Sequence, residues 1–423
     1  MKRQDARTPE ERDDSGSGSR PGLLVSWRPG VFLLLFAACR GAPIPAEKSP
    51  ATPDDVSAEL AQREADAFRL GDLDGDGRAE LVVERGGQVD GVGPGHLLAV
   101  CDVDGDGKED PVLAVGNDLV AAGRRAAGIG PIARAACIDP DGDGRYAIAA
   151  AGIWEIDGPA LVDRAGDLGI QLPKSPAALL VAPVIGAAPD VFVLVDGGPN
   201  LYFAAQPNGK WAELADAFGL QDRDEKQRAA AAAFDLDEDG ELDLALANRG
   251  GRHRLFVRRG GGFLDVAPPP WAQASAGGPI VAGDLDGDGH DEVYAAPGRL
   301  FTLRQGLTVP IEPGSLAGLG EVTAAAICDL DGDGRVELIV LAGGKLSLHR
   351  ARGAKPLRAI RVLTQAGAPA RGASVWMRAR RVVPETGDPA LYLPANRDVM
   401  ITWQNGTTRS FGQGGTPIVA RPR

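Results

Sequence analysis

An acidic loop of nine residues recurs six times along this chain. Each copy has Asp at positions 1, 3 and 5, and five copies have Asp or Glu at position 9, as in DLDGDGRAE. A tight turn brings carboxylates with this spacing around one point, and Gly at position 6 permits the sharp bend. Oxygen-only ligands with several formal charges favour Ca²⁺ over transition metals. The spacing therefore predicts calcium loops.

The six loops define the candidate metal ligands. They are Asp72, Asp74, Asp76 and Glu80; Asp102, Asp104, Asp106 and Asp110; Asp139, Asp141 and Asp143; Asp235, Asp237, Asp239 and Asp243; Asp284, Asp286, Asp288 and Glu292; and Asp329, Asp331, Asp333 and Glu337. We expect up to six Ca²⁺ sites. The Asp139 loop is expected to be the weakest, because Ala147 stands at its ninth position. One such loop could be a plain turn, but six with one spacing argue against that interpretation.

The residues that flank the loops predict strands. Position 12, where an EF-hand needs a bidentate acid, is apolar in every copy. After position 9 the chain enters apolar runs such as ELVVE and ELIVL, which are typical of strands. Each loop is therefore expected to join two strands, which excludes an EF-hand and a dockerin.

A seventh copy without the acids lies between the third and fourth loops. The segment LLVAPVIGAAPDVFVLVDGG keeps the apolar runs and has Asp190 at position 9, but Ala182, Val184 and Gly186 replace the acids. Successive copies start 30 to 53 residues apart. Spacing in the upper part of that range matches one four-stranded propeller blade per repeat. We therefore predict an all-β fold, with a seven-bladed β-propeller over residues 56–352.

The repeat also resembles a known family. An Ala-rich strand, the acidic loop, a second strand and a Gly-rich hairpin follow one another most clearly in residues 229–267. This pattern resembles the FG-GAP/VCBS repeat of integrin-α-like β-propellers. The resemblance implies that the calcium loops lie on one rim, are chiefly structural, and leave the opposite face to carry ligand contacts.

Residues 353–423 are predicted to form a small β domain. The stretches LRAIRVLTQAGAPARGASVWM and RDVMITWQNGTTRSF alternate apolar and polar residues, and Asn405-Gly406 is a hairpin signal. They resemble the ASPIC/UnbV domain through Gly372, Ala373 and Trp403, although the family's Pro-Ser after the Trp is absent here. Asn405 could alternatively accept a glycan in a eukaryote. The domain order resembles the cartilage acidic protein family and its bacterial relatives.

The N-terminal residues predict targeting rather than folding. An apolar run of eight residues, Val31 to Ala38, follows a basic flank and is too short to span a bilayer. The sequence LFAAC resembles a bacterial lipobox. We expect a leader over 1–38, then a lipidated Cys39 with a Pro- and Ala-rich tether over 39–55. A plain secretory signal or a chance apolar stretch are the alternatives. The expected location is outside the cell or on its envelope, as an outer-membrane lipoprotein.

The remaining cysteines stand in apolar runs before acidic loops. Cys101, Cys137 and Cys328 are expected to be small, buried core residues. A disulfide between two of them is an alternative in an oxidising compartment, but the sequence does not assign the pair. The absence of CxxC motifs and Cys/His clusters argues against a zinc site.

The composition favours a non-catalytic binding or adhesion protein. A formal net charge of −13 argues against nucleic acid as a partner. The sequence shows no catalytic motif, and its four histidines are scattered, so no catalytic residue is predicted. We expect a monomer with an unknown protein or glycan ligand, and membrane contact only through the lipid anchor.

Two alternatives remain open. One is a propeller-fold enzyme acting on polysaccharide, such as a lyase. It would require converging Arg, Tyr and carboxylate side chains at the central channel, outside the calcium loops. The other concerns the basic stretch Asn248 to Arg259, which we interpret as a solvated hairpin edge but which could bind an anion or a glycan.

Overall fold

A computed structural model describes residues 53–55, 64–273, 275–304, 306–377, 379–383 and 390–422. Within these ranges the regular secondary structure is almost all strand, with the short helices α2 (Ala165–Leu168), α3 (Ala215–Phe218), α4 (Pro269–Ala272) and η3 (Gly314–Leu316). The predicted leader, Cys39 and most of the predicted tether lie outside the described residues. In the described part of the chain, no helix has the length and apolar composition needed to cross a membrane.

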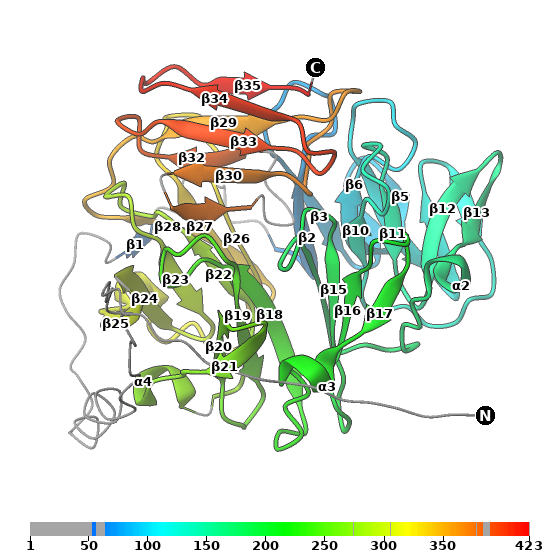
Figure 1. The fold of residues 1–423 in the computed structure, drawn as a ribbon, viewed down its shortest axis with the longest axis horizontal. Coiled ribbons are helices and arrows are strands. Elements are labelled where there is room, and N and C mark those ends of the chain that lie inside the picture. The colour runs from blue at the N-terminus through cyan, green and yellow to red at the C-terminus, as the bar shows by residue number, and fades with distance from the viewer. Residues whose placement is uncertain are drawn as a thin grey trace, which may run out of the picture. The chain divides into compact units, whose positions relative to one another are not determined.

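The repeat region forms seven four-stranded antiparallel sheets within the described residues (Figure 1). In order, they are β2 (Ala67–Gly71), β3 (Glu80–Arg85), β4 (Gln88–Val89) and β5 (Gly93–Pro94); β6 (His96–Cys101), β7 (Asp110–Val115), β8 (Asp118–Ala121) and β9 (Arg124–Ala126); β10 (Ala136–Ile138), β11 (Ala147–Ala149), β12 (Ile153–Asp157) and β13 (Ala160–Asp163); β14 (Ala178–Ala182), β15 (Asp190–Leu194), β16 (Leu201–Ala205) and β17 (Trp211–Glu213); β18 (Arg228–Phe234), β19 (Asp243–Asn248), β20 (Arg254–Arg259) and β21 (Gly262–Asp265); β22 (Ile280–Gly283), β23 (Glu292–Ala295), β24 (Arg299–Arg304) and β25 (Leu307–Ile311); and β26 (Val322–Cys328), β27 (Glu337–Ala342) and β28 (Lys345–Ala351), completed by β1 (Pro53–Asp55).

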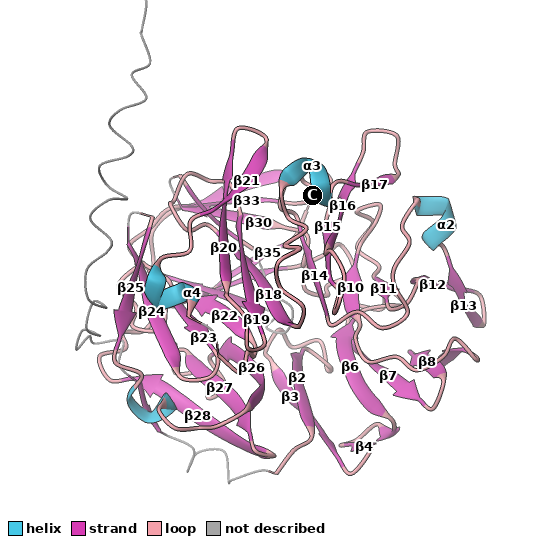
Figure 2. Cartoon of the chain, turned by 90° about the horizontal axis from the view of Figure 1, so that it is seen from below, coloured by secondary structure: helices cyan, strands magenta, loops and turns pink. Residues whose placement is uncertain are grey.

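The first strands of these sheets form the inner wall of a closed ring (Figure 2). Strand β2 contacts β6, and the contacts continue through β10, β14, β18, β22 and β26, which returns to β2. These strands are rich in small residues, as in RAAAAAF of β18 and VTAAAIC of β26. Small side chains let seven backbones approach the centre. The architecture is therefore a β-propeller, and its sheets match the seven predicted copies in number.

The last sheet takes its outer strand from the beginning of the described chain. Strand β1 pairs with β28, with Pro53 opposite Ala351. Ser315 in η3 donates a hydrogen bond to the Pro53 carbonyl at 3.1 Å. Residues 53–55, predicted from the sequence to be part of the tether, belong to the propeller, because pairing with them covers the edge of β28.

Larger side chains pack between neighbouring sheets. Trp271 of α4, which is 1% exposed, lies 5.1 Å from the ring of Phe301 in β24. The three cysteines predicted to be buried are all buried. Cys101 and Cys137 form a disulfide, with a Cα–Cα distance of 6.1 Å, which links β6 to the neighbouring inner strand β10. The sequence had left this pairing open.

The C-terminal residues form two further sheets with a hydrophobic core of their own. Their strands are β29 (Arg358–Val362), β30 (Ser374–Met377), β31 (Arg380–Val382), β32 (Ala390–Leu393), β33 (Val399–Thr402), β34 (Thr408–Phe411) and β35 (Ile418–Ala420). The Asn405-Gly406 signal is confirmed as a hairpin, because β33 pairs with β34 across it.

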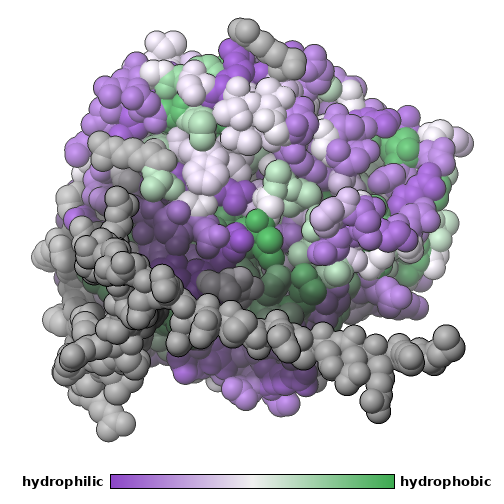
Figure 3. Space-filling view, in the orientation of Figure 1, coloured by the Kyte–Doolittle hydropathy of each residue, from purple (hydrophilic) through white to green (hydrophobic). Residues whose placement is uncertain are grey.

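In the face drawn in Figure 3, hydrophilic residues dominate the margins and hydrophobic residues gather nearer the middle.

Candidate metal sites

Each acidic loop joins the first and second strands of its sheet. In the first sheet, Asp72 follows β2, and Glu80 opens β3 opposite Gly71. The residue at position 9 opens the second strand in all six acidic copies. The expectation that the loops connect strands is therefore confirmed. Because the seven inner strands are equivalent, all six loops lie at the same end of the ring.

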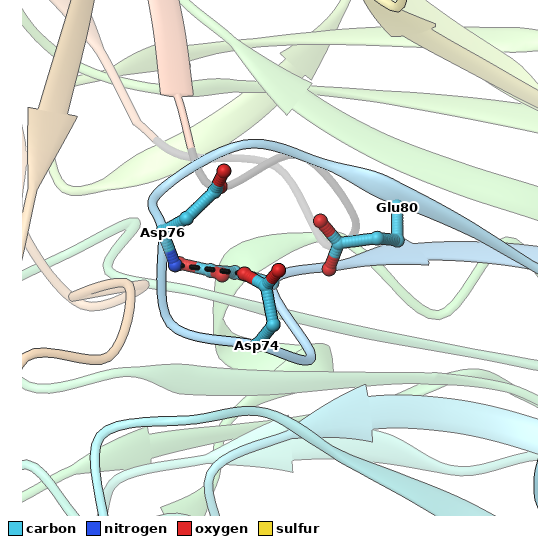
Figure 4. Close-up of side chains that lie close together, drawn as sticks. Asp74, Asp76 and Glu80 are labelled. Atoms are coloured by element: carbon cyan, nitrogen blue, oxygen red, sulfur yellow. Dashed lines mark hydrogen bonds between the residues drawn. The ribbon is translucent and has the colours of Figure 1, made fainter.

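The carboxylate at position 1 orders the turn. Asp72 accepts hydrogen bonds from the backbone N–H groups of Gly75 and Gly77, both at 2.8 Å. Glu80 accepts a bond from the backbone of Leu73 at 2.6 Å. Figure 4 shows Asp74, Asp76 and Glu80 on this loop, with the hydrogen bond from the Asp76 N–H to Asp74. These contacts hold the carboxylates close together.

Ligand atoms in at least five of the loops lie within 4.8 Å of one another. The groups are Asp72, Asp74, Asp76 and Glu80; Asp102, Asp104 and Asp110; Asp139, Asp141 and Asp143; Asp235, Asp237 and Asp239; and Asp284, Asp286 and Glu292. Asp106, Asp243 and Asp288 lie on the same loops but outside these groups. In the Asp329 loop, the backbone N–H groups of Gly332 and Gly334 bind the first carboxylate as in the other copies.

Burial raises the pKa of some of the ligand carboxylates. Desolvation is the main cause, and it raises the pKa of Asp139 and of Asp284 to about 7. The pKa of Asp110 also rises to about 7, because burial is reinforced by the charge of Asp104. Backbone N–H groups stabilise the charged forms of Asp139 and Asp284 only in part, and a cation on the loop would supply the missing positive charge.

Two carboxylate oxygens give a direct test of fit. Asp104 Oδ1 and Asp237 Oδ1 are buried and have no hydrogen-bond partner. Buried polar atoms are nearly always satisfied, so these oxygens are free to coordinate an ion. The donor set contains only oxygen and carries several negative charges, which suits a hard divalent cation. The residues present therefore fit Ca²⁺.

In three sheets, an arginine of the third strand forms an ion pair with an acid of the loop, and these loops therefore differ from the others. Arg259 in β20 pairs with Asp237, Arg304 in β24 with Asp288 at 3.1 Å, and Arg350 in β28 with Asp331 at 2.8 Å. Sequence reasoning missed these pairs, although each Arg stands sixth in the aligned runs RLFVRR, RLFTLR and KLSLHR. The Asp72 loop forms no ion pair with a described residue. Its negative charge is therefore the least compensated by arginine.

The basic stretch between residues 248 and 259 is paired with acids. Arg254 contacts Asp222 at 2.7 Å and Asp265 at 3.1 Å, and Arg259 contacts Asp239 at 2.8 Å. This charge pairing argues against an anion or glycan site. The prediction of a solvated hairpin edge is wrong, because β20 lies between β19 and β21 in its sheet and much of the stretch is buried.

The fourth sheet shows what replaces an acidic loop. Asp190 opens β15, as predicted for position 9, and is buried. It accepts hydrogen bonds from the Tyr202 hydroxyl and from the backbone of Ile185, both at 2.8 Å. Burial raises its pKa to about 6. Protein donors thus hold this carboxylate, and the loop lacks the other acids of a metal site.

The C-terminal domain packs on all six acidic loops. A Cβ added to the glycine at position 6 would lie between 2.7 and 3.4 Å from an atom of residues 356–394 in every case. The contacts are Gly77 with Arg361, Gly107 with Ala366, Gly144 with Thr364, Gly240 with Trp376 and Ala379, Gly289 with Pro394, and Gly334 with Pro356 and Leu357. The backbone of Arg381 donates to the Asp235 carboxylate at 2.8 Å. The rim with the loops is therefore a docking surface.

Position 8 of the loops supplies much of this docking. Glu109 pairs with Arg371 and Asp291 with Arg380. Tyr146, at position 8 of the third loop, donates to the Pro369 carbonyl at 2.8 Å. Sequence reasoning gave these residues no role. Their position in the loop could have indicated this role. Position 8 directly precedes position 9, and the side chains of neighbouring residues at the start of a strand point to opposite faces of the sheet.

We expect Gly107→Ala to destabilise the protein more than Gly86→Ala. Both glycines have positive φ, +93° and +59°, so each substitution costs roughly 1 kcal/mol or more of backbone strain. Only the Cβ at Gly107 would meet another part of the chain, 2.7 Å from the Ala366 carbonyl oxygen. Thermal melting and hydrogen exchange of residues 358–420 measure the difference. Equal effects would contradict tight docking at this loop.

A closed ring of four-stranded antiparallel sheets, six of them with an acidic loop between the first two strands, defines a β-propeller with candidate metal sites. A family model described as an FG-GAP-like repeat matches residues 235–295, which include the fourth and fifth acidic loops. The chain is similar to mouse cartilage acidic protein 1, with 30% identity over 52% of this chain and 38% of the mouse protein. The protein of that name from Xenopus tropicalis is 27% identical over 59% of this chain and 45% of its own length.

This chain thus spans less than half the length of these relatives. A solved structure of BBS1N in complex with ARL6DN, soaked with lead, covers 73% of this chain and 98% of its own, with a TM-score of 0.46 at 13% identity. The resemblance to FG-GAP-repeat propellers and to cartilage acidic proteins, predicted from the sequence, is confirmed.

Proposed function

We propose that this protein is a calcium-stabilised, non-catalytic binding or adhesion module of the cell envelope or extracellular space. Ca²⁺ on the acidic loops neutralises the carboxylates and stiffens the rim on which the C-terminal domain docks. The observation that carries the proposal is the clustering of carboxylates on the acidic loops, where burial raises the pKa of Asp110 and Asp139 and where one buried oxygen each of Asp104 and Asp237 has no hydrogen-bond partner. A monomer with a protein or glycan ligand on the exposed face opposite the loops fits this arrangement.

The loop residues have separate roles in holding the ion. The carboxylate at position 1 is fixed by backbone N–H groups, as Asp72 is by Gly77. Acids at positions 3 and 9, such as Asp74 and Glu80, turn oxygens towards the same point. When bound, the ion supplies charge neutralisation and cross-linking of loop segments. No part of this arrangement requires a chemical reaction.

Calorimetric titration of the metal-free protein with CaCl₂ tests the proposal. Asp74→Asn is expected to remove or weaken one site by about tenfold, because the ion loses a charged ligand. Asp90→Asn, at a side chain that is 56% exposed and outside the loops, is the matched control. No binding heat up to about 10 mM calcium, the upper range for extracellular modules, would contradict the calcium assignment.

Calcium binding is expected to release protons. In the metal-free protein burial raises the pKa of Asp110, Asp139 and Asp284 to about 7, above the unfolded value of 3.8. The stability that these groups contribute is therefore fully present below about pH 4 and is lost as the pH rises through about 7. Calcium holds the same groups ionised and removes this loss.

Melting temperatures from about pH 5 to pH 8, with and without calcium, measure this linkage. The melting temperatures measured with calcium and without calcium should differ more and more as the pH rises. Titrations near pH 6.5 in two buffers of different ionisation enthalpy should show net proton release. Parallel melting curves would show that the ion does not bind these carboxylates.

The lining of the central channel supports binding over catalysis. Arg69 and Arg134 line its wider part, but no Tyr or carboxylate does so among the described lining residues. The acid–base pair that a polysaccharide lyase would require is thus not assembled at this place. Screening the protein against glycan and protein arrays, with and without calcium, would identify the ligand.

The proposed lipid anchor can be tested independently. If Cys39 carries the lipid, the wild-type protein should fractionate with membranes and incorporate labelled fatty acid in a bacterial host. Cys39→Ala should abolish both, while Cys328→Ala serves as the cysteine control. Membrane fractionation that is unaffected by Cys39→Ala would remove the lipoprotein assignment and leave the propeller unchanged.

A further inference from the structure

An apolar channel runs through the ring, between the inner strands. Its wider part is a cavity of about 260 Å³ at the end where these strands begin, and it includes Arg134 and Thr323. A second cavity of about 200 Å³ shares Leu180 and Ala325 with the first and extends to Val383 of the C-terminal domain. The acidic loops follow the other ends of the inner strands. The channel mouth therefore faces away from the docked domain.

Two arginines stand at the wider part without an acidic partner. Arg69 is half-buried and donates to the carbonyls of Leu98 at 2.9 Å and Phe68 at 2.7 Å. Arg134 is exposed and donates to the carbonyls of Ala177 and Ala133, each at 3.0 Å. Neither forms an ion pair with a described residue. Backbone carbonyls leave their formal charge uncompensated.

The electrostatics of this mouth favour an anion. Burial and the charge of Arg134 lower the pKa of Arg69 to about 10. Burial and the charge of Arg249 lower the pKa of Arg134. Glu84 acts on Arg69 in the opposite sense, but its carboxylate is engaged by His96 and the Leu97 backbone. A cationic mouth on a chain with net charge −13 is a local exception.

We propose that this channel binds an anionic amphiphile, a long-chain carboxylate, with its head group on Arg69 and Arg134 and its chain along the inner strands. Guanidinium groups match the geometry of carboxylates. The wall below them consists mainly of Ala, Val, Leu and Ile from β14, β18, β22 and β26. Such a wall solvates an unbranched hydrocarbon chain without leaving polar atoms unpaired.

The same wall argues against a sugar or a peptide inside the channel. Among the described residues that line the wider cavity, the side chains with a hydroxyl, amide or guanidinium group are those of the two arginines and Thr323. Hydroxyl or peptide groups placed deeper would lose their hydrogen bonds to water and gain few in return. The inference goes beyond the proposed function by adding a second ligand class. It does not depend on the calcium sites.

Calorimetric titration of the full chain with dodecanoate tests the proposal, in calcium-free buffer because free calcium precipitates dodecanoate, and below the micellar concentration. We expect one dodecanoate per chain. Dodecanol should bind about tenfold more weakly, because it lacks the charge that the arginines recognise. Butyrate should not bind measurably, because it lacks the chain. Equal binding of dodecanol and dodecanoate would overturn the assignment of the head group.

Variants locate the site. Arg134→Gln should weaken dodecanoate binding by about tenfold, and Ala325→Leu should abolish it by filling the channel. Arg125→Gln, at an exposed side chain on the outer strand β9, is the matched control. Binding that survives Ala325→Leu would place the ligand elsewhere and overturn the proposal.

A second measurement separates this inference from the calcium proposal. Arg134→Gln should keep the calcium-dependent shift in melting temperature, which shows that the variant is folded. Failure of the wild-type protein to bind dodecanoate, with that shift intact, would refute the channel ligand alone. Capture of an acidic peptide in place of dodecanoate would equally refute it.

Discussion

Removal of calcium is expected to lower the melting temperature by about 10 °C or more. Each ion that binds only the folded state stabilises it by about 2.7 kcal/mol at a hundredfold excess over its dissociation constant. In a fold of roughly 350 residues, an unfolding entropy of about 2.1 cal/mol/K per residue makes 1 kcal/mol correspond to about 1.4 °C. About three well-occupied loops therefore suffice for the predicted shift. Calorimetric melting in about 10 mM CaCl₂ and in excess chelator measures it.

Two variants test whether the calcium-dependent shift in melting temperature depends on the Asp72 loop. Asp74→Asn should reduce the calcium-dependent part, because the Asp72 loop combines four close carboxylates with no arginine partner among the described residues. Asp167→Asn is the control, because its side chain is 76% exposed and lies on α2, away from the loops. Superimposable melting curves with and without chelator would refute the structural role of calcium.

The repeating features of the fold were predictable from the sequence. The acidic loop imposes a fixed spacing, and the apolar runs on either side have strand composition. The position of Asp190 in the copy without acids identified a sheet whose other ligands are lost. In all these cases residues close in the chain determine the structure, because a loop and its two strands form one hairpin.

Features that depend on distant residues were not predictable. The contacts between Arg371 and Glu109 and between Arg381 and Asp235 join residues far apart in the chain. Neither a single Arg in a turn, such as Arg371, nor a backbone N–H, such as that of Arg381, has a sequence signal that names its partner. The disulfide was left open for the same reason, because the order of inner strands around the ring, and not the spacing of cysteines, brings Cys101 to Cys137.

The segment at residues 53–55 shows a further limit. PDD has neither strand composition nor alternation, and sequence analysis therefore treated it as tether. It forms a strand because β28 presents an open edge at the point where the ring closes. Here pairing with the open edge of β28 outweighs the low strand propensity of the residues themselves.

Asp222→Ala is expected to destabilise the propeller by about 3–5 kcal/mol, the range for removing one partner of a buried ion pair. The Asp222 side chain is 1% exposed and contacts Arg228 at 3.3 Å and Arg254 at 2.7 Å. Arg228 is itself fully buried, and burial lowers its pKa against the opposing charge of Asp222. Its remaining side-chain partners are the neutral amides of Asn200 and Asn248. The guanidinium would therefore stay buried without the counter-charge that it contacts, and the charges of Glu225 and Asp196 would act on it only from farther away.

Asp224→Ala is the matched control for this loss. Asp224 contacts the same Arg254, at 3.6 Å, but its side chain is 89% exposed. Exposed ion pairs contribute at most about 1 kcal/mol, so urea unfolding should separate the two variants clearly. The double variant Asp222→Leu with Arg228→Met should recover part of the loss, because it removes both buried charges together. If Asp222→Ala and Asp224→Ala unfold at the same urea concentration, burial of the ion pair does not determine the stability of this sheet.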